Sequence, residues 1–236
     1  MQRNDQTIYT KHARSMWNGQ HRFQRMLADQ VRPRLKYFDR VTSDWRGITT
    51  LDLGCGGGFM SEALARRGAY VIGIDPSEAV LDAARTHAES QGLEITYRVG
   101  VGEAIPLPGA SVDRVICVDV LEHVQNVGKV IAEIRRVLHP GGLFFFDTIN
   151  RNRLATFMVV TVTEDLLRMI PRGAHDPAKF IRPEELKAAL EENGFTCSDD
   201  FVGMGFTRLN RQLDVEFALT NSTHVMYIGH AMLAAE

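Results

Sequence analysis

The stretch LDLGCGGGF, residues 51–59, decides the fold expected for this chain. It places four glycines in five positions, directly after an apolar run that begins at Ile48. A strand followed by a glycine turn and a helix lets a ligand approach the backbone, because the free N–H groups and the helix dipole favour a negative group. We therefore expect a ligand-binding loop between the first strand of an α/β sheet and the helix that follows it.

Strand-like and helical patterns alternate after this loop. Strands are expected at ITTLDL (48–53), AYVIGID (69–75), ITYRV (95–99), DRVICV (113–118) and LFFFDT (143–148), with helices between them and a further helix from Pro183 to Gly194. This alternation is typical of parallel strands wrapped by helices on both faces. The expected fold class is α/β, with a doubly wound, mainly parallel sheet of seven strands and Rossmann-like connections.

Two regions fall outside this alternation. Residues 1–47 are expected to form an N-terminal helical flank or lid, and residues 48–236 one α/β domain. Within that domain, residues 150–180 are an insertion with a dense apolar stretch between arginines. An amphipathic segment with basic edges can rest its apolar side chains on an anionic membrane. The alternative is that the insertion covers a substrate site or packs in the core.

Composition excludes several classes of protein. The net charge is −2 with dispersed lysine and arginine, so we expect no nucleic-acid partner. Cys55, Cys117 and Cys197 stand too far apart to suggest a disulfide framework or a thiolate metal site. No run reaches the roughly 18 apolar residues of a spanning helix. We expect a cytoplasmic protein, with peripheral contact to the inner face of the membrane through residues 150–180.

Acids flank the glycine loop and narrow the choice of ligand. Asp75 ends the second strand about 20 residues after the loop, where an acid accepts hydrogen bonds from ribose hydroxyls. A nicotinamide cofactor would require a glycine where Phe59 stands. The motif D-x-G-x-G-x-G instead begins with Asp52, which can meet the ammonium group of an amino-acid-bearing nucleotide. The motif resembles motif I of the class I methyltransferases, which implies S-adenosyl-L-methionine held by Asp52, Gly54, Cys55, Gly56, Gly58, Asp75 and Pro76.

The next two strand ends are expected to complete the cofactor site. Methyltransferases of this class often have an aspartate in a GDAEALPF-like run, but this chain has GVGEAIPL, with Val101 at the aspartate position. Gly102 can still offer its backbone N–H, and Glu103 follows it. Val118, after DRVICV, is expected to pass beside the cofactor through its backbone.

The sequence VDVLEHV brings three polar side chains to the end of a strand. Asp119, Glu122 and His123 point from one face if the turn is helical. His123, with Glu122, can remove a phenolic proton, or the three side chains can bind a divalent cation such as Mg²⁺ or Zn²⁺. A packing role at a helix start is the structural alternative. His175, in the insertion, can help close a pocket or cap a loop.

The chain as a whole resembles a known enzyme family. The order LDLGCGGG, GIDPSEAV, DVLEHV, HPGGLFFFDTINRN and EDLLRMIPRGAHDPAKFIRPEEL resembles the ubiquinone-biosynthesis O-methyltransferases, which methylate polyprenylated catechol rings. The resemblance implies cofactor contacts by Arg34, Gly54, Asp75 and Val118, and metal binding by Asp119, Glu122 and His123. The family commonly has glutamate where this chain has Asp119, which shortens the reach by one methylene. Its early tandem tryptophan is only Met16–Trp17 here.

These patterns and the resemblance together predict an enzyme. We expect an S-adenosylmethionine-dependent O-methyltransferase that acts on a phenolic or catechol hydroxyl of a hydrophobic aromatic molecule of the polyprenylated quinone-precursor type. Two alternatives remain open: a small-molecule O-, C- or N-methyltransferase of secondary metabolism, and a protein that binds the cofactor without catalysis. The sequence does not predict the oligomeric state.

Overall fold

The computed structural model describes residues 3–5, 7–13, 16–17, 22–198, 201–209 and 215–235. Its strands are β1 (Thr49–Leu53), β2 (Tyr70–Asp75), β3 (Ile95–Val99), β4 (Val112–Cys117), β5 (Leu138–Ile149), β6 (Phe195–Cys197), β7 (Val202–Leu209), β8 (Val215–Thr220) and β9 (Met226–Leu233). Its α-helices are α1 (Thr7–His12), α2 (Arg22–Val41), α3 (Phe59–Ala65), α4 (Glu78–Ser90), α5 (Val127–Val137), α6 (Arg153–Thr156) and α7 (Pro183–Glu192). A π-helical segment, η2 (Phe157–Leu166), continues α6, and a 3₁₀ turn, η3 (Pro177–Lys179), follows later.

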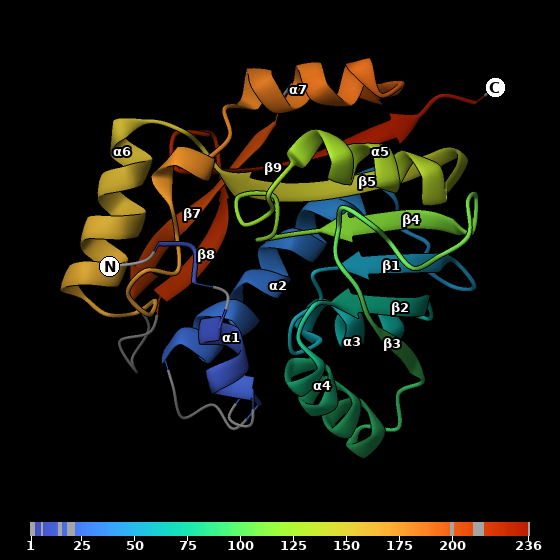
Figure 1. Cartoon of the computed structure of the whole chain (residues 1–236), viewed down its shortest axis with the longest axis horizontal. Helices are drawn as coiled ribbons and strands as arrows, with labels where there is room; N and C mark the ends of the chain where they lie inside the picture. Colours follow the sequence, from blue (N-terminus) through green and yellow to red (C-terminus); the bar gives the residue numbers. More distant parts are fainter. Residues whose placement is uncertain are drawn as a thin grey trace.

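All the strands in the described ranges belong to one sheet (Figure 1). Its order is β3-β2-β1-β4-β5-β9-β7-β8, and β6 also pairs with β9. The doubly wound α/β fold predicted from the sequence is confirmed. The sheet has nine strands in these ranges instead of the expected seven, because the end of the chain adds four antiparallel strands, β6 to β9.

The five strands β1 to β5 pair in parallel and therefore end at the same edge of the sheet. β1 lies between β2 and β4. The chain adds β2 and β3 on one side of β1, then crosses over and adds β4 and β5 on the other side. Ligands of open α/β sheets bind beside such a reversal, outside the carboxyl ends of the strands. The glycine loop follows β1 and lies at this point.

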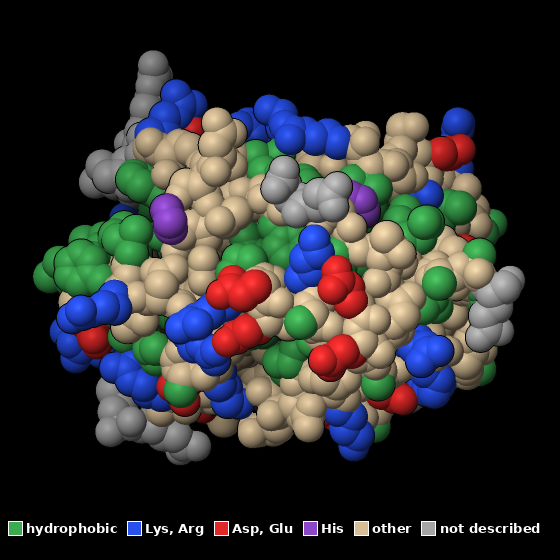
Figure 2. Space-filling model, turned by 90° about the horizontal axis from the view of Figure 1, so that it is seen from above, with side chains coloured by type: hydrophobic (Ala, Val, Ile, Leu, Met, Phe, Trp, Pro, Cys, Tyr) green, Lys and Arg blue, Asp and Glu red, His purple; other side chains and the backbone are tan. Residues whose placement is uncertain are grey.

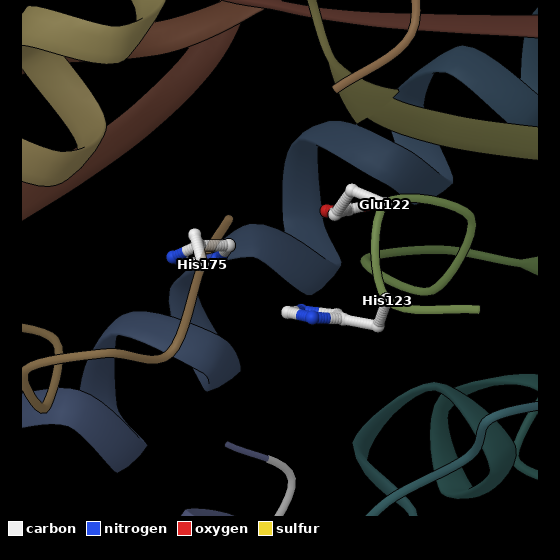
Figure 3. A group of neighbouring side chains, drawn as sticks. All are labelled: Glu122, His123 and His175. Carbon is white, nitrogen blue, oxygen red and sulfur yellow. The ribbon is translucent and has the colours of Figure 1, made fainter. Parts of the chain in front are cut away.

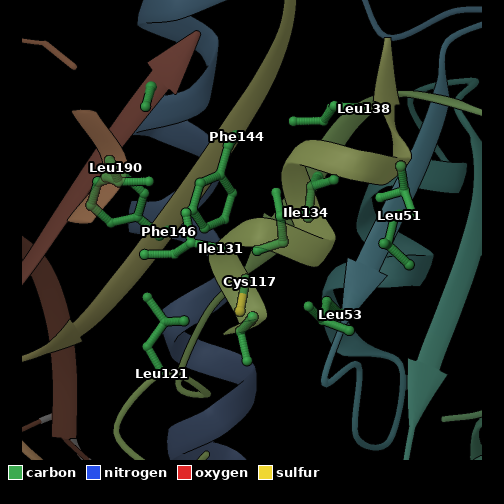
Figure 4. Close-up of a cluster of buried hydrophobic side chains, with 14 of the residues drawn as sticks. Leu51, Leu53, Cys117, Leu121, Ile131, Ile134, Leu138, Phe144, Phe146 and Leu190 are labelled. Carbon is green, nitrogen blue, oxygen red and sulfur yellow. The ribbon is translucent and has the colours of Figure 1, made fainter. Parts of the chain in front are cut away.

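Side chains of β5 alternate between two buried layers. Phe144 and Phe146 face α5 and α7, where they join the cluster that includes Ile131, Ile134 and Leu190 (Figure 4). Phe145 points to the opposite face and packs on Phe38 of α2, with 4.6 Å between ring centroids. This period of two explains why an uninterrupted apolar run forms a strand here, since both of its faces are covered by helices.

The antiparallel strands extend the sheet beyond β5. β9 pairs with both β5 and β7, and β7 and β8 form a hairpin at the edge. Helix α2 lies against β8, and the Phe217 N–H donates to Asp29 at 2.7 Å. The insertion at 150–180 contributes α6, η2 and η3 on the same side of the molecule. None of the described helices has both the length and the apolar character needed to cross a bilayer.

Phe145 should be among the most important residues for stability, because it is fully buried between the sheet and α2. We expect Phe145→Ala to lower the free energy of unfolding by about 3–5 kcal/mol, since the helix and sheet cannot close the cavity completely. Urea denaturation followed by circular dichroism measures this loss. Phe206→Ala, at a side chain that is 53% exposed, is the control and should cost far less. Equal losses in the two variants would contradict the assignment of Phe145 to the core.

Candidate active site

The glycine loop after β1 has the backbone geometry of a ligand cradle. Gly54, Gly56 and Gly58 have φ angles of 71°, 51° and 85°, which L side chains rarely adopt. A Cβ at Gly56 would meet no heavy atom within 4 Å, so the space above this glycine is open to a ligand. The side chain of Cys55 packs in a buried cluster with Tyr97, so Cys55 can reach a ligand only through its backbone.

Two acids hold positions at this loop. Asp52 is 1% exposed and its Oδ2 accepts a hydrogen bond of 2.6 Å from the Ser61 hydroxyl. Burial raises the pKa of Asp52 to about 6. Asp75 accepts from the backbone N–H of Gly56 at 3.1 Å and of Ser77 at 2.9 Å, and burial raises its pKa. Asp75 therefore orders the loop and also places a carboxylate beside it.

The remaining residues predicted to contact a cofactor differ in how they are placed. Pro76 is exposed directly after β2, and Val118, 8% exposed, follows β4. Gly102 is buried, and a Cβ there would press on Val130 at 3.1 Å. Glu103 accepts from the backbone N–H groups of residues 125 and 126 at 2.8 and 3.3 Å. Its carboxylate therefore holds the turn before α5.

Residues 16 and 17, in the segment expected to form a flank or lid, lie against the glycine loop. The indole N–H of Trp17 donates to the Gly57 carbonyl at 2.8 Å, and the indole stacks on His87 with 3.6 Å between centroids. The Met16 side chain occupies the place that a Cβ at Gly57 would take. Met16–Trp17, which stands where the family commonly has two tryptophans, thus lies at the glycine loop.

A buried ion-pair network joins α2 to the ends of β4 and β5. Arg34, 3% exposed, contacts Asp119 Oδ2 through one terminal nitrogen and Asp147 Oδ2 through Nε, each at 2.6 Å. Burial opposes the charge on Arg34, yet the two carboxylates outweigh it and raise its pKa. Burial raises the pKa of Asp147 to about 6 despite the neighbouring arginine. Asp147 was missed from the sequence, although an acid directly after FFF at a strand end is a usable signal.

The segment after β4 does not form the helical turn that was considered from the sequence. Residues 119–126 form turns, α5 begins at Val127, and Asp119 has a φ of 54°. Glu122 is 1% exposed, and its Oε2 accepts from the Thr148 hydroxyl at 2.8 Å. Burial and, next, the charge of Asp119 raise the pKa of Glu122 to about 8.

His123 is buried beside Glu122 and contacts the N-terminal segment. Its Nδ1 lies 2.8 Å from Asn4 Oδ1, and the Asn4 amide donates to the His123 carbonyl at 3.0 Å. Burial, followed by His175 and Lys179, lowers the pKa of His123 to about 3. The imidazole is therefore neutral at physiological pH, with its Nδ1 hydrogen directed to Asn4.

His175 joins this group from the insertion. It is 8% exposed, its ring lies 5.1 Å from that of His123, and its Nδ1 lies 2.7 Å from Glu164 Oε1. Glu122, His123 and His175 each offer a ligand atom within 4.8 Å of the others (Figure 3). The predicted trio of Asp119, Glu122 and His123 is thus not the set brought together: Arg34 holds Asp119, and His175 takes its place. Glu164 was missed, although the acid pair Glu164–Asp165 inside an apolar run is a usable signal.

A cavity of about 460 Å³ adjoins these polar groups and will be called the acceptor chamber. Its lining comes from α2, from the insertion and from β7 to β9, and it includes Phe23, Met26, Met158, Val159, Val162, Ile170, Met204 and Phe217. Asp119 and His175 also line it. The chamber is therefore apolar along most of its wall and polar where it meets the turn after β4.

Comparisons with known proteins agree with this geometry. Residues 51–146 match the family model described as a methyltransferase domain. A ubiquinone biosynthesis O-methyltransferase of Methylococcus capsulatus is 37% identical, covering 94% of this chain and 91% of that protein. An enzyme of the same name from Coxiella burnetii is 38% identical, covering 83% of this chain and 81% of that protein.

The fold is shared with solved structures of low sequence identity. A SAM-dependent methyltransferase from Aquifex aeolicus superposes with a TM-score of 0.62 at 19% identity, covering 85% of this chain and 89% of that one. The sequence relatives carry the closer assignment because they match most of the chain. The protein belongs to the family of ubiquinone biosynthesis O-methyltransferases, which are enzymes that use S-adenosyl-L-methionine as the methyl donor.

Proposed function

We propose that this enzyme methylates a phenolic hydroxyl on an aromatic acceptor with a long apolar substituent, of the polyprenylated quinone-precursor type. The acceptor chamber is the observation that carries the proposal, since an apolar wall ends at Asp119 and His175. A volume of about 460 Å³ lies in the range of small-molecule sites and can hold a ring with the first part of an apolar chain. The relatives, named for ubiquinone biosynthesis, support the same class of acceptor.

The residues at the glycine loop fit S-adenosyl-L-methionine. Open space lies over Gly56, and the Asp75 carboxylate stands where it can accept from ribose hydroxyls. Bound S-adenosyl-L-methionine would supply a methyl group activated on a sulfonium: a phenolate oxygen would attack the methyl carbon in line with the C–S bond, and the thioether S-adenosylhomocysteine would leave. The main task of the protein is then to hold the acceptor oxygen on that line, because correct orientation alone supplies much of a rate enhancement.

We propose that Glu122 and His123 assist loss of the phenolic proton to solvent as ligands of a cation, not as free bases. His123, with a pKa of about 3, is too weak a base to take a proton from a phenol of pKa about 10 by itself. A divalent cation bound by Glu122 and His123 would lower the pKa of the acceptor hydroxyl. Asp119 does not fit as the third ligand of such an ion, because its carboxylate is paired with Arg34 at 2.6 Å.

The insertion is proposed to contact an anionic membrane that holds the acceptor. Leu154, Phe157, Leu166 and Leu167 are about half exposed or more, which is unusual for large apolar side chains so close together in the chain. Seen from above, hydrophobic side chains gather at the left edge of the molecule, where Figure 1 draws α6, with Lys and Arg side chains beside them (Figure 2). Arg153 and Arg168 are exposed in this segment. Such a surface can bind lipid without a spanning helix.

The direct test of function uses isotope-labelled S-adenosylmethionine and a prenylated catechol. The expected product carries the labelled methyl group on oxygen, which NMR identifies from the methoxy signal. A label on carbon or nitrogen would favour the alternative of a secondary-metabolism methyltransferase. Cofactor binding without turnover of any aromatic acceptor would favour the non-catalytic alternative.

Asp75→Ala should weaken cofactor binding while leaving the sheet and helices folded, although the N–H groups of Gly56 and Ser77 also lose their acceptor. The loss of charge-assisted hydrogen bonds to the ribose should raise the Kd for S-adenosylmethionine by about 10-fold to 150-fold, the equivalent of about 1.5–3 kcal/mol. Isothermal titration calorimetry measures this Kd. Asp82→Ala, at an exposed acid of α4, is the matched control. Unchanged affinity of Asp75→Ala would remove the ribose role.

Val162→Trp should narrow the acceptor chamber, because Val162 lines it from η2. We expect the KM for a prenylated catechol to rise about tenfold or more, with kcat/KM for unsubstituted catechol nearly unchanged. Thr161→Trp changes the neighbouring exposed residue, which does not line the chamber, and should alter neither value. If both acceptors lost activity equally in Val162→Trp, the apolar chain would not occupy this chamber.

Replacing Phe157 and Leu166 by serine should abolish membrane binding. The native protein should co-sediment with vesicles containing anionic phospholipid, and less of it should do so at high salt. The double variant should stay in the supernatant while methylating unsubstituted catechol at the native rate. Equal sedimentation of the native protein and the double variant would place any lipid contact elsewhere.

A further inference from the structure

One polar side chain of α2 lines the acceptor chamber without a partner. Gln30 is 3% exposed, and it belongs to the wall of the chamber. Its Oε1 atom is buried and accepts no hydrogen bond from any residue that the structure describes. A buried amide oxygen without a donor is costly, because it has lost its bonds to water and gained none in the protein. Native proteins contain few such atoms, so this one indicates a group that meets a ligand.

Two other polar side chains of the chamber wall already have protein partners. Asp119 Oδ2 lies 2.6 Å from a terminal nitrogen of Arg34, and His175 Nδ1 lies 2.7 Å from Glu164 Oε1. Those contacts hold the carboxylate and the imidazole in place. Gln30 differs from both, because its amide oxygen is offered to the chamber with no contact to a described residue.

The position of Gln30 along α2 places it at the polar end of the chamber. Gln30 lies one helical turn before Arg34 and therefore on the same side of the helix. Arg34 reaches Asp119, which marks the polar end. Met26 and Phe23, one and two turns before Gln30, line the chamber with apolar side chains. The helix thus changes from apolar to polar in the direction of the turn after β4.

Contacts on both sides of Gln30 fix the helix that carries it. Asp29 accepts from the backbone N–H of Phe217 in β8 at 2.7 Å. Arg34 contacts Asp147 at the end of β5 at 2.6 Å. The backbone at Gln30 is therefore held against the sheet before any ligand binds. A hydrogen-bonding group that is positioned in advance selects its ligand at a smaller cost in ordering.

The chemistry of the unpartnered atom defines what it can recognise. An amide oxygen accepts a hydrogen bond and therefore requires an O–H or N–H group on the ligand. A catechol ring carries two neighbouring hydroxyls. One loses its proton to solvent, and its oxygen takes the methyl group as S-adenosylhomocysteine leaves. The other hydroxyl keeps its hydrogen and can donate it.

We propose that Gln30 is a specificity-determining residue of the acceptor chamber, and that its Oε1 accepts a hydrogen bond from the ring hydroxyl that is not methylated. The assignment rests on the proposed function, because it requires the aromatic ring at the polar end of the chamber. A site built to bond a hydroxyl rejects the analogue that lacks it, since the buried polar group is then left unpaired. A ring whose second oxygen already carries a methyl group has no hydrogen for Gln30, so transfer stops after one methyl group.

Kinetics with two matched acceptors test the assignment: a prenylated catechol and the prenylated phenol that lacks the second hydroxyl. The two are compared by kcat/KM, from which non-productive binding cancels. The native enzyme should prefer the catechol by about 10-fold to 100-fold. Gln30→Leu and Gln30→Met should each lower kcat/KM for the catechol by about this factor and leave that for the phenol within about twofold. The preference for the catechol should therefore disappear.

Met26→Leu is the matched control, because it changes an apolar side chain of the same helix and the same wall. It should leave the preference for the catechol unchanged. The melting temperature of Gln30→Leu should be no lower than the native value, since the substitution removes an unpaired buried amide. A lower melting temperature with equal losses for both acceptors would show a packing role and overturn the proposal. Native preference in both Gln30 variants would also overturn it.

Binding without turnover separates this proposal from the proposed function. Calorimetry in the presence of S-adenosylhomocysteine, which has no methyl group to transfer, gives the Kd for the prenylated catechol. Gln30→Leu should raise this Kd by about 10-fold to 100-fold. If the Kd depends on Gln30 but no phenolic oxygen is methylated, the proposed function is refuted and the ring contact of Gln30 stands. If the native enzyme methylates oxygen but Gln30→Leu changes neither the Kd nor the preference, only the Gln30 proposal fails.

Discussion

The ion pairs of Arg34 with Asp119 and Asp147 fix helix α2 against β5 and against the turn after β4. The arginine belongs to α2, Asp147 to β5, and Asp119 to the turn that carries Glu122 and His123. Asp147 also accepts from the backbone N–H of Asp119 at 2.8 Å. Breaking a buried pair by removing one partner leaves an uncompensated charge, which typically costs about 3–5 kcal/mol. The position of the polar turn thus depends on a residue nearly ninety positions earlier in the chain.

The ion pairs of Arg34 lie between two groups of strands in the one sheet. The parallel strands β1, β2 and β4 carry the glycine loop, Asp75 and the polar turn on the cofactor side. The antiparallel strands β7 to β9, with α2 and the insertion, enclose the acceptor chamber. Arg34 lies between these two groups of strands and pairs with both Asp119 and Asp147. Such a rigid link can contribute to methyl transfer, because the reaction is accelerated when donor and acceptor are held in line.

The sequence predicted the glycine loop and the strands beside it well, because the signals for them are local. Glycines with positive φ, an acid at a strand end and apolar runs of period two are set by neighbouring residues, and the loop at 54–58 and Asp75 lie where expected. The polar cluster was predicted less well. Asp119 was placed with Glu122 and His123 on an assumed helical turn, but its partner proved to be Arg34, which only the folded chain brings near. His175 and Glu164 lie on a loop and a π-helical segment, whose geometry no simple periodicity encodes.

The N-terminal segment has a consequence for how the protein is handled. Asn4 bonds to His123, and Trp17 bonds to the carbonyl of Gly57, so residues near the start of the chain touch both the polar cluster and the glycine loop. An affinity tag attached ahead of Asn4 would lie close to the contact between Asn4 and His123. The last strand, β9, ends at Leu233, and Figure 1 places that end of the chain far from α1. A tag attached after β9 should leave the contacts of Asn4 and Trp17 undisturbed.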